Sequence, residues 1–167
     1  MLVVFRVDSS AEIGYGHLSR CLVLANLLRS REHTCLFIGQ RLPSNKLESV
    51  SNYNHKYHFI PQTHDIQDDR AIVLDIAHKA NADWIVLDSY AYEFNSEFFF
   101  KESNIRLLVI DDFPDKKHYC DILLNCNYFK RDSAPYKGCI PAFTLKLIGV
   151  SYFLLRDEFV RTQSNDV

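Results

Sequence analysis

Short apolar runs and amphipathic segments alternate along most of this 167-residue chain. Apolar runs without polar alternation, such as Ile85 to Leu87 and Leu107 to Ile110, are typical of strands covered on both faces. The strands predicted on this basis are Leu2–Val7, Thr34–Gly39, Tyr57–Ile60, Trp84–Asp88, Leu107–Asp111 and Asp121–Asn125. Apolar positions at helical spacing predict helices over His17–Arg31, Ser44–Ser51, Ile66–Ala80 and Asn95–Glu102.

This alternation of strands and helices predicts the fold class. Right-handed crossovers between successive strands give a parallel sheet with helices on both sides. We therefore expect a three-layer α/β/α, Rossmann-like domain with a mainly parallel sheet. Asp65 is the best candidate to cap the helix that starts at Ile66. Residues Tyr128 to Ala142 show no clear periodicity, and no element is predicted there.

Composition and charge narrow the class of protein. With 47% hydrophobic and 24% charged residues, the chain is typical of one globular domain with a sizeable core. A net charge of −2 provides no basic field for nucleic acid or for an anionic membrane. No apolar run is as long as a membrane span, and the amino terminus begins with a strand, without a secretion signal. We expect a cytoplasmic protein with neither nucleic-acid partner nor membrane span.

Five cysteines, an odd number in a chain without a secretion signal, predict free thiols. His118, Cys120, Cys126 and Cys139 are conceivable zinc ligands, but their spacing lacks the paired C-x₂₋₄-C of a structural zinc site. Packing in the core or at a strand edge is the favoured interpretation of Cys120, and neither a metal nor a cofactor is expected. Surface positions are predicted for the histidines among polar residues, at 33, 55, 58, 64 and 78.

The segment from Arg6 to Arg20 is the most informative part of the chain. It runs from a predicted strand through a glycine-bearing loop into a helix, and this order places a ligand site at the carboxyl end of a parallel strand. Gly14 and Gly16 allow close approach of the backbone, and the helix start offers unpaired N–H groups to an anion. His17 lies at that start. The two glycines alone are equally consistent with a phosphate-binding loop and with an ordinary loop that binds nothing.

Further polar residues follow other strands and reach the same edge of the sheet. Asp8 has two interpretations of similar weight: it orients His17 or binds substrate, or it only closes a turn. Arg6 lies inside its strand and is expected to pair with a buried acid. Of Asp111 and Asp112, one is expected to cap a turn and the other to contact substrate.

Five motifs resemble one known family. R-x-D-S-S-x-x-I-G-x-G-H-x-x-R-C, from Arg6 to Cys21, resembles the opening of the UDP-sugar hydrolases of pseudaminic acid biosynthesis. These enzymes are similar in fold to the GT-B glycosyltransferases. The other four motifs occur in the family's order, at Trp84–Tyr90, Leu108–Phe113, His118–Asn127 and Tyr152–Phe159. Two departures lie within them, with Cys126 in place of glutamine and Asp157 in place of proline.

The resemblance implies a reaction and a site. The family hydrolyses the C1–O bond of a UDP-linked 2,4-diacetamido-2,4,6-trideoxy sugar with inversion, and His17 matches its catalytic histidine. A helix start disfavours the imidazolium, so a neutral ring that accepts a proton is expected. Without the resemblance, a capping histidine would be slightly favoured. The expected substrate-binding residues are Asp8, Gly14, Tyr15, Gly16, Arg20, Asp88, Tyr90, Asp112 and Asn127.

The length of the chain departs from the family. A GT-B enzyme has two α/β domains with the active site between them, and the second domain usually holds most of the nucleotide. We therefore expect residues 1–155 to form the amino-terminal domain, and residues 156–167 to begin an interdomain connection or a polar tail. The expected partners are the UDP-sugar and either a second α/β domain or another copy of the chain. Two alternatives remain: a GT-B glycosyltransferase-like domain of polysaccharide synthesis, and a non-catalytic partner or remnant module.

Overall fold

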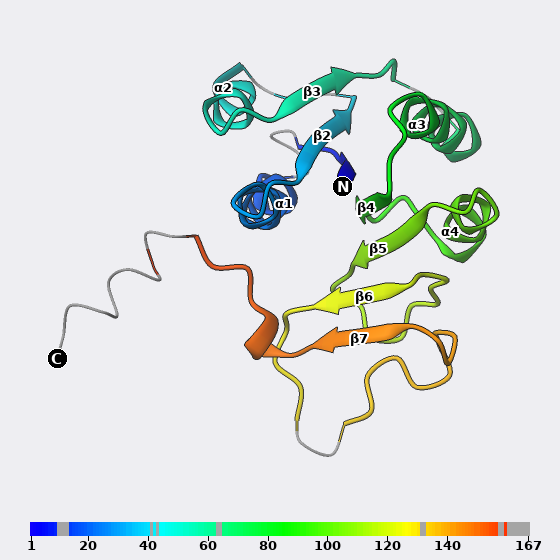
Figure 1. The fold of residues 1–167 in the computed structure, drawn as a ribbon. Helices are drawn as coiled ribbons and strands as arrows, with labels where there is room; N and C mark the ends of the chain where they lie inside the picture. The colour runs from blue at the N-terminus through cyan, green and yellow to red at the C-terminus, as the bar shows by residue number, and fades with distance from the viewer. Residues whose placement is uncertain are drawn as a thin grey trace, which may run out of the picture.

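The fold was analysed in a computed structural model that describes residues 1–9, 14–40, 42, 44–62, 65–130, 133–156 and 159. The described residues form a seven-stranded sheet in the order β3-β2-β1-β4-β5-β6-β7 (Figure 1). Every neighbouring pair of strands is parallel. The strands are β1 (Leu2–Val7), β2 (Thr34–Gly39), β3 (Lys56–Phe59), β4 (Trp84–Asp88), β5 (Arg106–Ile110), β6 (Ile122–Asn125) and β7 (Leu145–Ile148).

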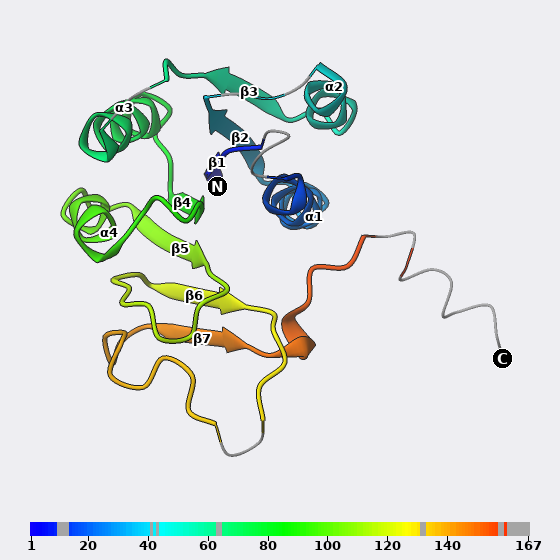
Figure 2. The same cartoon turned by 180° about the vertical axis from the view of Figure 1, so that it is seen from behind.

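Helices cover both faces of the sheet, which gives the three layers predicted from the sequence. They are α1 (Gly16–Arg29), α2 (Ser44–Asn52), α3 (Ile66–Lys79), α4 (Phe94–Lys101) and the short 3₁₀ helix η1 (Val150–Tyr152). The first two helices lie on one side of the sheet, and α3 and α4 lie on the other, as the two opposite views show (Figures 1 and 2). The α/β fold class predicted from the alternation is confirmed.

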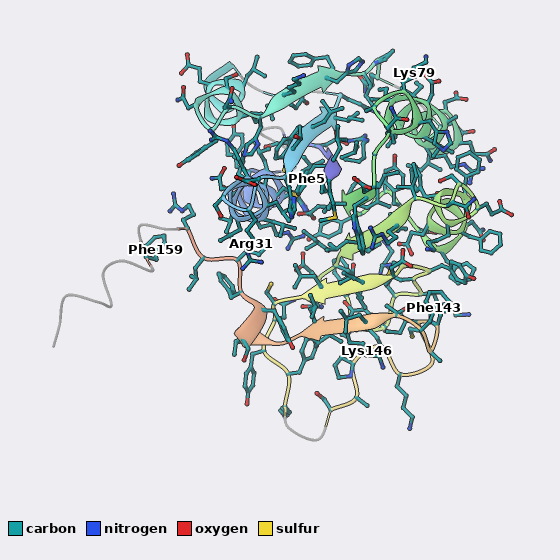
Figure 3. The ribbon with its side chains drawn as sticks, in the orientation of Figure 1. Phe5, Arg31, Lys79, Phe143, Lys146 and Phe159 are labelled. Carbon is teal, nitrogen blue, oxygen red and sulfur yellow. The ribbon has the colours of Figure 1, made fainter. Side chains whose placement is uncertain are left out.

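Alternation along each strand divides the core between the two faces. In β1, Val3, Phe5 and Val7 belong to the cluster on the α1 side, and Val4 belongs to the cluster on the α3 side. Phe5 lies in the interior of the molecule, whereas Lys79 lies at its periphery (Figure 3). Residues an even number of positions apart in a strand thus face the same helix layer. A polar side chain at the end of a strand can therefore contact only polar groups on the face to which its position turns it.

The elements predicted from the pattern are largely confirmed. The six predicted strands and four predicted helices are present, with ends that differ by at most two residues. Asp65 caps α3, because its Oδ1 accepts the backbone N–H of Gln67 at 2.8 Å. The edge strand β7 was not predicted. Its short apolar run is interrupted by Lys146, and its side chains are exposed or only half-buried.

Two predictions about buried groups have opposite outcomes. Arg6 is buried and pairs with Asp69 of α3 through two hydrogen bonds of 2.9 and 2.7 Å, so the expected buried acid is confirmed. The surface position predicted for His55 is wrong. Its ring is 6% exposed, its Nε2 lies 2.8 Å from Asn26 Oδ1, and it packs against Phe37. His64 lies outside the described residues.

All five cysteines are free thiols, as predicted, and Cys120 is buried in the core. Within the part of the chain that the structure describes, no helix is long and apolar enough to cross a membrane.

Gly39, at the end of β2, yields a stability prediction. A Cβ atom there would lie 2.5 Å from the backbone oxygen of Val7 and 2.5 Å from the hydroxyl of Tyr57. Gly39→Ala should therefore lower the free energy of unfolding by about 1–3 kcal/mol, the usual cost of overpacking. Gly16→Ala is the matched control, because a Cβ there meets open space at the start of a helix. Urea denaturation should find the control unchanged or slightly stabilised. Equal stability of the two variants would contradict this packing.

Candidate active site

The loop between β1 and α1 brings His17 to the carboxyl edge of the sheet. Gly14 has a φ of 87°, a left-handed conformation that favours glycine, and its carbonyl oxygen accepts a hydrogen bond of 3.1 Å from the hydroxyl of Ser9. Helix α1 begins at Gly16, preceded by Tyr15, so His17 is in its first turn. The first backbone N–H groups of α1 lie beside this histidine and give that end a partial positive charge.

His17 is held by Asp88. Asp88 ends β4 on the same face as Val86, which belongs to the core cluster beneath α1. Its Oδ1 lies 2.6 Å from Nδ1 of His17, and both side chains are largely buried. A carboxylate is only an acceptor, and the other group near Nδ1, Nη2 of Arg20, is farther away at 3.2 Å. The contact with Asp88 therefore favours the imidazole proton on Nδ1 and leaves Nε2 with the free electron pair. This arrangement resembles the acid–histidine half of a hydrolase triad.

Arg20, which is partly exposed, completes the charge cluster. It lies one turn beyond His17 on α1, and its Nε and Nη2 donate to the two oxygens of Asp88 at 2.7 and 2.6 Å. Its Nη1 reaches both oxygens of Asp112 at 3.0 Å. Burial alone would raise the pKa of Asp88, but the hydrogen bonds from Arg20 and His17 hold that pKa below its usual range. Asp88 is therefore a carboxylate at neutral pH.

Tyr90 forms the exposed wall of the site. Its hydroxyl donates to Asp112 Oδ2 at 2.7 Å, and its ring packs edge-on against His17 with 4.7 Å between the centroids. Burial and the hydrogen bond to Asp112 raise the pKa of Tyr90 to about 12. Because the phenol stays protonated at neutral pH and the side chain is 47% exposed, Tyr90 can present both a polar group and an aromatic face to a ligand.

The structure separates Asp8 from this cluster. Asp8 continues β1 on the face of Arg6, so it points to the α3 side, where it pairs with Nη1 of Arg6 at 2.7 Å and accepts the N–H of Gln40 at 3.0 Å. The prediction that Asp8 orients His17 is therefore wrong, and Asp88 has that position. Substrate binding by Asp8 remains a prediction.

The remaining predicted residues lie close to the cluster. Asn127 donates from its side chain to the backbone oxygen of Asp112 at 3.3 Å. Asp111 caps a turn by accepting the N–H of Phe113 at 2.9 Å, which confirms that one of the two neighbouring acids has this role. Phe113, which no motif singled out for the site, packs edge-on against Tyr90 at 5.1 Å. Of the substrate-binding residues predicted from the sequence, Asp8 is thus the one whose side chain lies on the other face of the sheet from His17.

A groove of about 330 Å³ adjoins the cluster on the α1 side. Its polar wall includes Arg20, Asp112 and Asn127, and its apolar wall comes from the segment after η1. The lining residues are Gly16, Ser19, Arg20, Val23, Asp112, Cys126, Asn127, Phe153, Leu154, Leu155, Arg156 and Phe159. Sequence reasoning missed the apolar wall, although its residues lie in the motif Tyr152–Phe159. Among the described residues, no three His, Cys, Asp or Glu side chains gather as metal ligands do.

Comparison with solved structures shows the class of fold. MurG from Acinetobacter baumannii aligns with a TM-score of 0.56 and 8% identity, over 80% of this chain and 42% of its own. A glycosyltransferase from Rickettsia africae ESF-5 aligns with a TM-score of 0.51 and 15% identity, over 66% of this chain and 29% of its own. A UGT transferase from Siraitia grosvenorii, solved with UDP, aligns with a TM-score of 0.51 and 17% identity, over 67% of this chain and 28% of its own. The chain thus has the α/β domain of a GT-B fold.

The sequence comparison identifies a relative with a named reaction. The chain is 31% identical over 166 residues to the UDP-2,4-diacetamido-2,4,6-trideoxy-β-L-altropyranose hydrolase of Campylobacter jejuni. The match covers 95% of this chain and 53% of that enzyme, so the chain spans about half the length of the relative. No protein-family model matches the chain. The resemblance predicted from the motifs is confirmed: the chain is similar in sequence to this hydrolase over nearly its whole length.

The contact with Asp88 predicts one tautomer of His17. In its neutral form the ring should carry its proton on Nδ1, which long-range ¹H–¹⁵N correlation spectra of the isolated chain can read directly. Asp88→Asn should release this preference, because an amide can either donate or accept. Asp75→Asn is the control, since Asp75 pairs with Lys79 on the exposed face of α3, and it should leave the tautomer unchanged. A neutral ring with its proton on Nε2 in the wild-type chain would refute the assignment.

Proposed function

We propose that this chain provides the catalytic half of a UDP-sugar hydrolase. The substrate is a UDP-linked 2,4-diacetamido-2,4,6-trideoxyhexose, and the product enters pseudaminic acid biosynthesis. The single observation that carries the proposal is the contact of His17 with Asp88, in a chain related to a hydrolase of that substrate class. The motif that carries His17 is one by which the sequence resembles the family.

His17 acts as the general base. With its proton fixed on Nδ1 by Asp88, the ring accepts the proton of a water molecule at Nε2. The water oxygen forms a bond to the anomeric carbon, and the C1–O bond to UDP breaks on the opposite face, which inverts the configuration. UDP leaves as an anion and needs no strong acid. The positive charge that develops on the histidine is stabilised by the carboxylate of Asp88.

The remaining residues bind and orient the substrate. Tyr90 and Asn127 offer a hydroxyl and an amide at the rim, and both suit the acetamido groups of the sugar. The backbone around Gly14, Tyr15 and Gly16 offers N–H groups at a helix start, where a diphosphate is favoured. Arg20 is already shared between two carboxylates. We therefore assign it the role of holding Asp88 and Asp112 in place, with less part in binding the diphosphate.

His17→Ala in the complete enzyme should lower turnover by about 10²–10⁴-fold, the usual worth of a positioned acid–base group, and should change substrate affinity much less. His58→Ala is the control, because His58 is exposed on β3, outside the proposed site. The assay measures UDP release and the free sugar by nuclear magnetic resonance. Free sugar with inverted configuration supports the hydrolase. A glycoside product would instead identify a glycosyltransferase, and turnover at the wild-type rate in His17→Ala would remove His17 from the mechanism.

The chain alone should bind UDP no more tightly than about millimolar, or about −4 kcal/mol. The physical reason is that one glycine loop has to compete with water for the diphosphate without a second domain to enclose it. Calorimetry on the chain measures this affinity, and a second α/β domain made separately from a relative should restore tighter binding and hydrolysis. Micromolar UDP binding by the chain alone would show that its own residues form the nucleotide site. No gain from the second domain would favour a non-catalytic module.

A further inference from the structure

A buried histidine lies on the other side of the sheet from His17. His118 is 1% exposed and sits between two acids, with Nδ1 at 2.7 Å from Glu97 Oε1 and Nε2 at 3.3 Å from Asp111 Oδ2. Glu97, from α4, is itself fully buried and accepts the backbone N–H of Tyr119 at 2.6 Å. Two carboxylates that contact the two nitrogens of one buried ring favour its protonated, positively charged form. The mechanism proposed above does not use this cluster.

The cluster is connected to the site through the backbone of two turns. Asp111 accepts the hydroxyl of Tyr136 at 2.7 Å and the N–H of Phe113 at 2.9 Å, which fixes the turn that carries Asp112. Tyr136 in turn accepts from Asn125 at 2.8 Å. The side-chain oxygen of Asn125 then accepts the N–H of Asn127 at 2.9 Å. Asp112 and Asn127, on the α1 side, are thus held by groups buried on the α4 side.

We propose that His118 is a positioning residue of the active site: paired with Glu97, it clamps Asp111 and thereby holds Asp112 where Arg20 and Tyr90 bind it. The link to hydrolysis rests on the function proposed above, whereas the link to the geometry of Asp112 does not. Asp112 binds both Nη1 of Arg20 and the hydroxyl of Tyr90, and these two side chains contact Asp88 and the ring of His17. A change in the position of Asp112 should therefore alter the position of His17, the proposed base, through Arg20 and through Tyr90.

The charge state of the cluster gives the clamp a pH range. Burial lowers the pKa of His118, but the carboxylates of Asp111 and Glu97 on either side of its ring outweigh burial and raise that pKa from 6.5 to about 9. A group whose pKa rises on folding adds stability that is complete below its unfolded value and is lost as the pH rises through the folded value. In the folded chain His118 therefore stays protonated, and the clamp charged, until the pH approaches about 9. The stability that the raised pKa adds is complete below about pH 6.5 and is lost as the pH rises through about 9.

Other groups that face His118 do not supply this titration. The ring of Tyr136 lies 5.9 Å from that of His118, and burial raises the pKa of its phenol far above its usual range. Burial and the charge of Glu97 raise the pKa of the Cys120 thiol in the same way. The backbone N–H of His118 donates to the carbonyl oxygen of Cys139 at 2.9 Å, a contact without charge. Of these three side chains, His118 is thus the one whose pKa lies near 9.

The first test follows the carboxyl ¹³C signal of Asp112 and the guanidinium ¹³C signal of Arg20 in the chain as it stands, from pH 6 to pH 10. In the wild type both signals should shift with one midpoint near pH 9. Glu97→Gln removes one partner of the imidazolium and should move the midpoint to lower pH. The double variant Glu97→Gln/His118→Gln keeps the net charge of the cluster, so it should fold, and it should lose the midpoint.

Val73→Ala is the control for general loss of stability, because Val73 is a fully buried core residue of α3 and belongs to neither polar cluster described here. This variant should keep the midpoint near pH 9. A wild-type chain whose Asp112 and Arg20 signals show no such midpoint would overturn the proposal. So would a double variant that keeps the wild-type midpoint, since another group would then control the shift.

The second test measures hydrolysis in the presence of the second domain. The double variant should lower turnover by about 10–100-fold, the cost of a small misplacement in an active site, and Val73→Ala should leave it near the wild-type rate. Wild-type turnover in a folded double variant would overturn the catalytic part of the proposal. Absence of hydrolysis in the wild type would instead contradict the proposed function, and the ¹³C titration would still decide whether His118 positions Asp112.

Discussion

The carboxylate of Asp88 is the group on which the proposed site depends. It is 1% exposed and accepts hydrogen bonds from His17 and Arg20, and the thiol of Cys21 lies 3.5 Å from it. A buried charge of this kind is costly unless its partners are fixed around it. The cost is offset here because α1 supplies the histidine and the arginine from one helical face. The same contacts that make the carboxylate tolerable in the core also set the tautomer of the proposed base.

Parity along the strands explains why the edge of the sheet carries two separate polar clusters. Asp88 and Asp112 share the parity of Val86 and Ile110, which face α1, and they meet there with Arg20. Asp111 shares the parity of Val109, which faces the other helix layer, and it meets His118 there. Neighbouring residues of one turn thus serve different clusters. The turn itself joins the two, and this is the physical basis of the clamp assigned to His118.

Much of the fold and part of the site could be predicted from the sequence. Uninterrupted apolar runs located the strands that are covered on both faces, and the glycine loop before α1 located the edge where His17 lies. Asp8 was placed in the site because it follows the first strand at the carboxyl edge of the sheet, but alternation in β1 turns its side chain toward Arg6. The burial of His55 and the pairing of His118 depend on contacts between residues far apart in the chain, which periodicity does not encode. The edge strand β7 was not predicted because Lys146 interrupts its short apolar run, although Leu147 and Ile148 pack partly buried against the two core clusters.

The most direct test of the account is a double-mutant cycle on turnover for His17 and Asp88, measured with the second domain present. If Asp88 acts by orienting His17, the contribution of Asp88 is already lost in His17→Ala. Adding Asp88→Asn to that variant should then lower turnover by less than about threefold further. Asp88→Asn alone should lower turnover by orders of magnitude, as expected for loss of the correct tautomer. Effects of the two substitutions that multiply fully in the double variant would contradict the account, because the two residues would then contribute independently.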